Sequence, residues 1–246
     1  MARPLSSGRV TGMTGIRSGD DVRRVGVLIE ASHRTIESAL WSALPPGVTL
    51  TTARVSDPAR PGSQDHGGEH LDPLVAGLDS VMTTEPQAVV VAIESAGLGS
   101  GLAGLRDIEH SLSAHAQVPV VTVSGAVVEW LLVRPWLRNL ALVAPVDPWV
   151  HEQFVRVLRE ASLQVGIGAD EPLVEALATS QRVVGAYRAC AASGPDVIVQ
   201  WGGQVFPDVV GGLSQWTRSP VVWSVHALLE VTLDRMSRST PRFAVP

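Results

Sequence analysis

The chain has 246 residues, of which 45% are hydrophobic and 17% charged, and its formal net charge at pH 7 is −5. This composition is typical of a globular protein with much buried sheet. The sequence has no basic stripe interleaved with aromatic residues and no apolar stretch near the roughly 20 residues of a membrane span. Neither nucleic acid nor a membrane is therefore an expected partner.

The amino-terminal segment, residues 1–24, lacks the apolar core of a signal peptide. We expect it to be a flexible leader and the protein to be cytoplasmic. The single cysteine, Cys190, excludes an internal disulfide framework and a cysteine-based metal site. His66 and His70 lie in a glycine-rich segment without a rigid scaffold, so we expect them to be solvated and predict neither a metal nor a cofactor.

In chain order, apolar runs bounded by Pro and Gly alternate with segments of helical periodicity. In the first half the expected strands are 25–29, 48–55, the run that ends before Glu94, and 119–122. The expected helices are 35–44, 71–84, 102–116 and 126–133. Residues 56–70 are rich in Pro, Gly and charge, which predicts a mobile loop, one that could cover a site.

The second half repeats this order. Its expected strands are 140–144, 163–167, 197–199 and 220–223, and its expected helices are 149–161, 172–192, 207–215 and 227–236. The repetition predicts an α/β fold of two similar Rossmann-like lobes with parallel sheets, related by pseudo-twofold symmetry, with the site in the cleft between them. The expected division is a leader (1–24), an amino-terminal lobe (25–134), a carboxy-terminal lobe (135–236) and a tail (237–246).

Glu94 and His33 are the candidate catalytic residues. A carboxylate at the end of a buried strand is costly unless it is paired, protonated or functional, so Glu94 is a candidate acid or base. The alternative is that Glu94 pairs with an arginine such as Arg34 or turns to solvent. His33, at a strand-to-helix turn, could donate to a substrate carboxylate or shuttle a proton, and it could equally cap the helix or face solvent.

Small residues at the other strand ends predict a cradle for a carboxylate or an oxyanion, because glycine permits close backbone approach and helix N-termini attract anions. The expected substrate-binding residues are Ser95, Ala96, Ser124, Gly125, Trp201, Gly202, Gly203, Gln204 and His226. For Trp201 the alternative is packing between the lobes, and for His226 it is a structural role. The run from Gly97 to Gly101 matches neither a dinucleotide fingerprint nor a phosphate loop.

Several segments resemble the aspartate/glutamate/hydantoin racemase superfamily, in particular its maleate isomerase and arylmalonate decarboxylase branch. Residues 122–129 (TVSGAVVE) are similar to the family's TSGAVVEAL segment, and residues 32–37 (SHRTIE) to its SSNTTME loop, with His33 in place of the asparagine. Residues 140–145 and 220–229 are similar to its LVTPY and PVVSSNQALL segments. The resemblance spans roughly residues 24–234.

The resemblance implies a cofactor-independent isomerase or lyase, such as a decarboxylase, that acts on a small carboxylate. In the family, one or two cysteines from opposite lobes act as acid, base or nucleophile, and loop amides and hydroxyls stabilise an enediolate-like intermediate. The first cysteine position corresponds to Ile93 or Glu94 here, the second to Gly202, and the family's tyrosine to Val146. The chain therefore lacks both cysteines at the matching positions.

Two functions stay open from the sequence. The first is an enzyme that uses Glu94 as its acid or base in place of the family's cysteines. The second is a catalytically silent descendant that binds a small ligand or a partner protein, which the loss of the cysteines and the tyrosine favours. Trp149 and Trp216, which we expect to be exposed, favour a homodimer.

Overall fold

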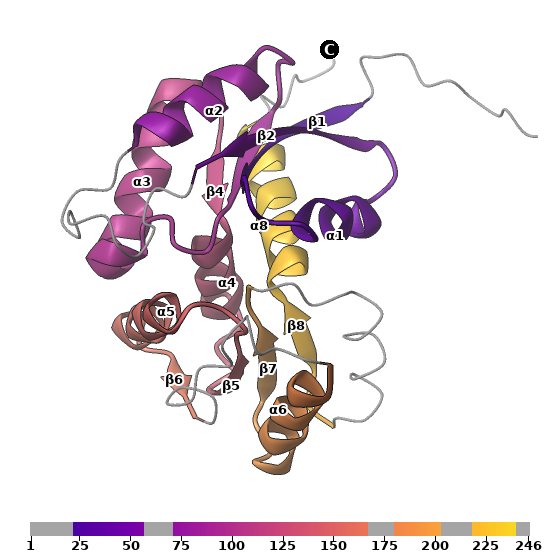
Figure 1. Cartoon of the computed structure of the whole chain (residues 1–246), viewed down its shortest axis with the longest axis vertical. Coiled ribbons are helices and arrows are strands. Elements are labelled where there is room, and N and C mark those ends of the chain that lie inside the picture. Colours follow the sequence, from indigo (N-terminus) through magenta and orange to yellow (C-terminus); the bar gives the residue numbers. More distant parts are fainter. Residues whose placement is uncertain (1–21, 57–70, 167–179, 203–217, 240–246) are drawn as a thin grey trace, which may run out of the picture.

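The computed structural model describes residues 22–56, 71–166, 180–202 and 218–239, which form two four-stranded parallel sheets with helices packed against them (Figure 1). The first sheet has the order β2-β1-β3-β4. Its strands are β1 (Arg23–Glu30), β2 (Val48–Val55), β3 (Ala88–Ala92) and β4 (Val120–Thr122). The accompanying helices are α1 (Ile36–Ala43), α2 (Asp72–Met82), the short 3₁₀ helix η2 (Leu98–Ser100), α3 (Gly101–Ala116) and α4 (Val123–Leu132).

The second sheet has the corresponding order β6-β5-β7-β8. Its strands are β5 (Asn139–Val143), β6 (Gln164–Val165), β7 (Val197–Gln200) and β8 (Val221–Trp223), and its helices are α5 (Pro148–Glu160), α6 (Ser180–Ala192) and α8 (Ser224–Ser239). Every pairing within both sheets is parallel. The predicted fold, two similar lobes with parallel sheets, is thus confirmed.

Alternation along the buried strands explains the layers. In β3, Val89 and Val91 face α2 and α3, whereas Val90 and Ala92 face α1 and α8. A strand covered on both faces has no polar face, so it appears in the sequence as a continuous apolar run. This is why the AVVVA segment of β3 could be recognised without an alternating pattern.

The two lobes share their last helices, α4 and α8, which lie side by side at the centre of the molecule (Figure 1). Leu228 of α8 belongs to the apolar cluster that contains Val90 of the first sheet. Val128 of α4 belongs to the cluster that contains Phe154 of α5. The boundary expected between residues 134 and 135 therefore divides the chain but not the hydrophobic core.

Some element ends differ from the prediction. β1 begins at Arg23 and α8 ends at Ser239, so the last residues of the predicted leader belong to a strand and the first residues of the predicted tail belong to a helix. Helix α4 begins at Val123, directly after β4, where the sequence predicted a loop. The side chain of Thr122 caps this helix by accepting a hydrogen bond from the Gly125 N–H at 3.0 Å, so no intervening loop is needed. The predicted loop at 57–70 and the predicted helix at 207–215 lie outside the described residues.

The large apolar side chains exposed in the described part of the chain are Trp41, Leu132, Val133 and Trp136. Trp149 is partly buried and Trp216 lies outside the described residues, so the homodimer stays a prediction. No helix within the described ranges is both long and apolar enough to cross a membrane.

Candidate active site

Glu94 and His33 face each other at the carboxyl ends of β3 and β1. His33 Nε2 lies 3.7 Å from Glu94 Oε1, and the two side chains are only 6% and 12% exposed. The separation exceeds a hydrogen bond, but catalytic contacts often shorten only when substrate binds. Arg34 is exposed, and no contact between it and Glu94 occurs among the described residues. Glu94 is thus directed toward a histidine and not toward Arg34 or bulk solvent.

Local contacts fix the orientation of His33. The Ile36 N–H donates to Nδ1 at 3.2 Å, and the His33 N–H donates to the Glu30 carbonyl at 3.0 Å. Arg54 on β2 donates to the His33 carbonyl at 2.9 Å. Because Nδ1 accepts a hydrogen bond, the neutral imidazole carries its proton on Nε2, the nitrogen that faces Glu94. His33 therefore both caps the start of α1 and presents a donor to Glu94.

The main chain around Glu94 is held by Ser124. Its hydroxyl, in the first turn of α4, donates to the Glu94 carbonyl at 3.1 Å. The Ala96 N–H donates to the Ile93 carbonyl at 3.3 Å, so residues 93–96 form a tight turn. The N–H groups of Ala96 and Gly125 thus both donate to acceptors within the chain. Ser95 and Ala96 are both buried.

Gly202, at the end of β7, brings the second lobe against Glu94. Its φ of +65° lies in the left-handed region that favours glycine. A Cβ built at Gly202 would overlap Val146 Cγ1 and lie 3.0 Å from Glu94 Cγ and 3.3 Å from Glu94 Oε1. Glu94 and Val146 therefore fill the space that a side chain at position 202 would need. Glu94, one of the two candidates for the first cysteine position, is thus a neighbour of Gly202, the second, across the two lobes.

A buried polar network that the sequence analysis missed supports Gly202. The Tyr187 hydroxyl donates to Gln200 Oε1 at 2.8 Å, and Gln200 Nε2 donates to the Gly202 carbonyl at 3.2 Å. Burial, together with the neighbouring Cys190, raises the pKa of Tyr187, so its hydroxyl stays protonated and keeps donating. One signal could have revealed the network, namely a glutamine at the end of the apolar run VIVQ.

Helix α5 holds the loop that follows Glu94, a second feature that the sequence did not reveal. Arg156 Nη2 donates to the carbonyls of Leu98 and Gly99 at 3.1 and 3.0 Å. Glu160 accepts a hydrogen bond from the Leu102 N–H at 2.7 Å and so caps the start of α3. Both residues belong to the second lobe, and spacing along the chain gives no indication of a contact some 58 residues away.

Two other predicted binding residues, Trp201 and His226, can be placed in the structure. Trp201 is fully buried and stacks on Phe154 of the same lobe, with ring centroids 3.9 Å apart, in an apolar cluster that also contains Leu98 and Leu105 of the first lobe. Its indole nitrogen has no hydrogen-bond partner among the described residues. His226 is exposed on α8, edge-on to Trp223, and no contact within the described ranges joins it to Glu94. Gly203 and Gln204 lie outside the described residues.

Cys190 lies buried in α6, where desolvation raises the pKa of its thiol to about 11, so the thiol is protonated at neutral pH. No group of three or more His, Cys, Asp or Glu side chains within the described part of the chain could hold a metal ion. His66 and His70 lie outside it.

No protein-family model matches the chain, and no curated protein matches it in sequence. Solved structures do match. The maleate isomerase from Pseudomonas putida S16, solved with maleate, is 19% identical with a TM-score of 0.72, covering 88% of this chain and 92% of that one. The Nocardia farcinica maleate cis-trans isomerase, solved with a covalently bound succinylcysteine intermediate, is also 19% identical with a TM-score of 0.72, covering 87% and 93%. An arylmalonate decarboxylase is 19% identical with a TM-score of 0.67, covering 87% and 92%.

The chain has the fold of these enzymes. The likeness extends over both lobes of the maleate isomerase-like fold, since each comparison covers most of this chain. The contact between Glu94 and Gly202 lies where the strand ends of the two sheets meet.

Proposed function

We propose that this protein is a cofactor-independent isomerase or lyase that moves a proton, or breaks a bond, next to a carboxylate of a small mono- or dicarboxylic acid. The observation that carries the proposal is the nearly buried pair of Glu94 and His33 at the strand ends. Similar folds are found in a maleate isomerase solved with maleate and in an arylmalonate decarboxylase, which supports a carboxylate as the substrate class.

Glu94 is the proposed acid and base. Its carboxylate takes a proton from the carbon next to the substrate carboxylate, which leaves an enediolate-like intermediate, and then returns the proton to the same carbon or to another one. In a decarboxylation the carbon–carbon bond breaks first, carbon dioxide leaves, and the carbanion takes its proton from protonated Glu94. In an isomerisation Glu94 thereby ends the cycle in the state in which it began, whereas after a decarboxylation it is left as a carboxylate and takes a proton from solvent before the next turnover.

His33 is the proposed hydrogen-bond donor. Its Nε2–H points to the space beside Glu94, where it would stabilise negative charge that develops on the substrate carboxylate. A second proton on the ring would have to go to Nδ1, which already accepts the Ile36 N–H. This arrangement favours a neutral imidazole that donates over a base that accepts, and it leaves the base role to Glu94.

Covalent catalysis has little support in this chain. Cys190 is a buried, protonated thiol, and all 19 residues of the Lys+Arg count are arginines, so there is no lysine to form a Schiff base. Since the N–H groups of Ala96 and Gly125 already donate within the chain, we assign the substrate carboxylate to the main chain at Gly202.

The alternative function is a catalytically silent ligand-binding protein. The packing of Val146 and Glu94 into the space at Gly202 favours it, because this packing closes the position of the second family cysteine. Binding and turnover can be separated experimentally. A dicarboxylate that raises the melting temperature of the protein without reacting would support the alternative.

The proposal is tested by proton NMR in D₂O with a panel of small carboxylates that includes maleate, succinate, malate and phenylmalonate. Deuterium incorporation reports the transfer of a solvent-derived proton to carbon, which follows carbon–hydrogen cleavage in an isomerisation and carbon–carbon cleavage in a decarboxylation; an elimination is followed by the appearance of its alkene product in the same spectra. Glu94→Gln should abolish incorporation and leave folding intact. Glu152→Gln, an exposed neutral substitution on α5, is the matched control and should not change the rate. An unchanged rate of deuterium incorporation in Glu94→Gln would refute the proposal.

A further inference from the structure

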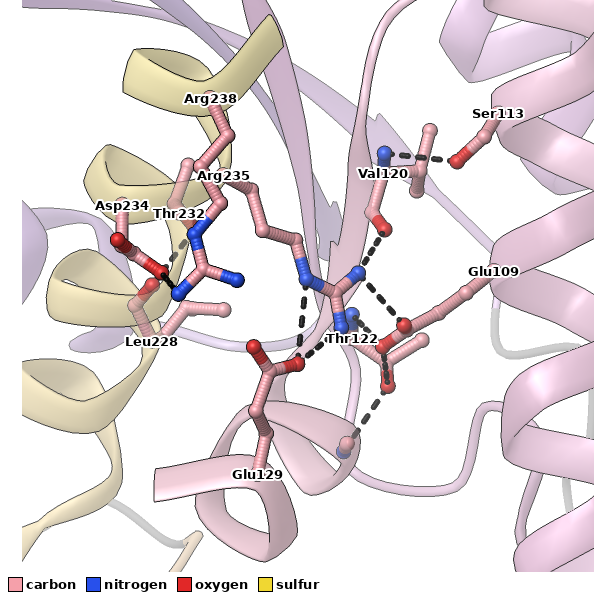
Figure 2. Close-up of polar contacts among 11 residues, drawn as sticks. Glu109, Ser113, Val120, Thr122, Glu129, Leu228, Thr232, Asp234, Arg235 and Arg238 are labelled. Carbon is pink, nitrogen blue, oxygen red and sulfur yellow. Dashed lines mark hydrogen bonds and ion pairs between the residues drawn. The ribbon is translucent and has the colours of Figure 1, made fainter. Parts of the chain in front are cut away.

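The carboxy-terminal half of α8 contacts the first lobe through Arg235 (Figure 2). The guanidinium donates to Glu109 on α3 at 2.9 Å and to the Val120 carbonyl on β4 at 3.2 Å. Its Nε and Nη2 both donate to Glu129 on α4. Burial disfavours the charged guanidinium, but the hydrogen bonds and charges of Glu129 and Glu109 outweigh it, so the pKa of Arg235 lies above its usual value. One side chain thus joins α8 to three elements.

Glu109 connects Arg235 to the start of α4. Its second carboxylate oxygen accepts the Thr122 N–H at 2.8 Å and the Thr122 hydroxyl at 2.9 Å, and its side chain is only 13% exposed. The Thr122 hydroxyl in turn accepts the Gly125 N–H. A Cβ at Gly125 would overlap Glu109 Oε1 and lie 2.7 Å from Thr122 Oγ1, so glycine is what lets the carboxylate approach the helix this closely.

The first turn of α4 then reaches Glu94. Ser124 is fully buried, and its hydroxyl donates to the Glu94 carbonyl. Contacts therefore run without a gap from Arg235 through Glu109 and Thr122 to the main chain of Glu94. A carboxylate near a helix N-terminus is favourable, but a largely buried one that loses its cation is strongly destabilised. The position of Glu109, and with it the first turn of α4, depends on Arg235.

We propose that Arg235 is a positioning residue for Glu94 that acts through Glu109, Thr122 and Ser124, an inference that rests on the proposed function of Glu94. Loss of the guanidinium releases Glu109, loosens the first turn of α4 and frees the Glu94 main chain from Ser124. The Glu94 carboxylate then leaves its place opposite His33. Because Arg235 does not contact the substrate, kcat falls while KM stays within about twofold.

A cavity beside the cluster makes a rescue experiment available. It has a volume of about 250 Å³ and is lined by Arg235, Glu109, Glu129, Arg106 and Gly125 together with leucines and valines of α3, of α4 and directly after α4. It is reachable from solvent, because Leu132 on its wall is 46% exposed. In Arg235→Ala the space of the lost side chain joins this cavity, so added methylguanidinium can enter and pair with the two glutamates again.

The test is hydrogen–deuterium exchange of the whole chain, with and without millimolar methylguanidinium. In Arg235→Ala the amides of Thr122 and Gly125 and the segment that carries Glu94 should exchange about tenfold faster or more, as for the loss of one hydrogen bond to a charged group. Methylguanidinium should restore the protection, and the same concentration of sodium chloride should not. The control is Arg238→Ala on the same helix, where the Arg238 side chain is 72% exposed and pairs with Asp234; it should change neither region.

Carbon-acid exchange of the substrate is followed in the same variants. A lowered kcat that methylguanidinium restores supports the proposal, as does an intermediate effect in Arg235→Lys, which keeps the charge but cannot span both glutamates. Uniformly faster exchange over the whole chain would overturn the proposal, as would unchanged exchange at Gly125 and Glu94. If Arg235→Ala does not fold, Arg235→Lys provides the test. If exchange rises locally in Arg235→Ala and methylguanidinium restores the protection, but no carboxylate is turned over, the link from Arg235 to Glu94 is supported and only the catalytic role of Glu94 is contradicted.

Discussion

Replacing Gly202 with alanine tests whether Glu94 and Val146 fill the space at the end of β7. The new Cβ would overlap Val146 Cγ1 and lie 3.0 Å from Glu94 Cγ, on a residue whose φ is +65°. A left-handed conformation costs a non-glycine residue about 1–2 kcal/mol, and overpacking of a filled site costs a further ~1–3 kcal/mol. Gly202→Ala should therefore lower the free energy of unfolding by about 2–5 kcal/mol.

Gly194→Ala separates the two contributions. Gly194 has nearly the same φ, +63°, but nothing lies within 4 Å of the Cβ that would be added there. This variant should show the backbone strain alone, about 1–2 kcal/mol. The excess cost of Gly202→Ala over Gly194→Ala then measures the overlap with Val146 and Glu94.

Val146→Ala should relieve the overlap. Alone it removes buried methyl groups and costs about 2 kcal/mol, but combined with Gly202→Ala it should recover about 1–3 kcal/mol relative to the sum of the single variants. Urea unfolding with an unchanged m-value measures each quantity. Equal costs for Gly202→Ala and Gly194→Ala, or simple additivity with Val146→Ala, would refute the packing described for the two strand ends.

Three further predictions concern named side chains. Cys190 should resist iodoacetamide at pH 8 in the native protein and react on unfolding, because burial raises the pKa of its thiol to about 11; rapid native labelling would contradict the buried position. Tyr187→Phe should lower the free energy of unfolding in urea by about 1–3 kcal/mol, since Gln200 Oε1 loses its buried donor, whereas a change of ~0.3 kcal/mol or less would argue against the network. Hydrogen bonds from the Asn139 and Arg138 amides lower the pKa of Asp196. The ionised Asp196 carboxylate therefore stabilises the folded protein above its usual pKa of 3.8, and this stabilisation disappears as the pH falls through the lower native pKa. Melting temperatures of wild type and Asp196→Asn should accordingly differ at pH 7 and converge in acid, and a gap that persists at about pH 2 would contradict this linkage.

The fold was predictable because its signals are local. Doubly covered strands such as β3 appear as continuous apolar runs, and helix α5 carries an apolar face that includes Phe154 and Leu158. Where the prediction failed, a contact distant in sequence decided the outcome. Thr122 starts α4 early because Glu109 and Gly125 both bond to its side chain. Local propensity at residues 123–125 contains no information about Glu109.

The site was predictable only in part, for the same reason. The sequence predicts that Glu94 and His33 lie near each other because both follow buried strands of one parallel sheet, whose carboxyl ends share an edge, and their side chains do lie close together. It could not show that Glu94 reaches Gly202, since that contact depends on how the two lobes pack. Trp201 follows an apolar strand in the same way as Glu94, yet it turns into the core and stacks on Phe154. The direction of a side chain at a strand end depends on the neighbours that receive it.

The most direct test of the central claim compares the rate of deuterium incorporation into one reactive carboxylate by wild type, Glu94→Gln and Cys190→Ala under identical conditions. Glu94 as the acid and base predicts that Glu94→Gln is slower by about 10²–10⁴-fold and that Cys190→Ala is as fast as wild type. The opposite result, in which incorporation persists in Glu94→Gln and is lost in Cys190→Ala, would contradict the role of Glu94 and identify the Cys190 thiol as the reacting group.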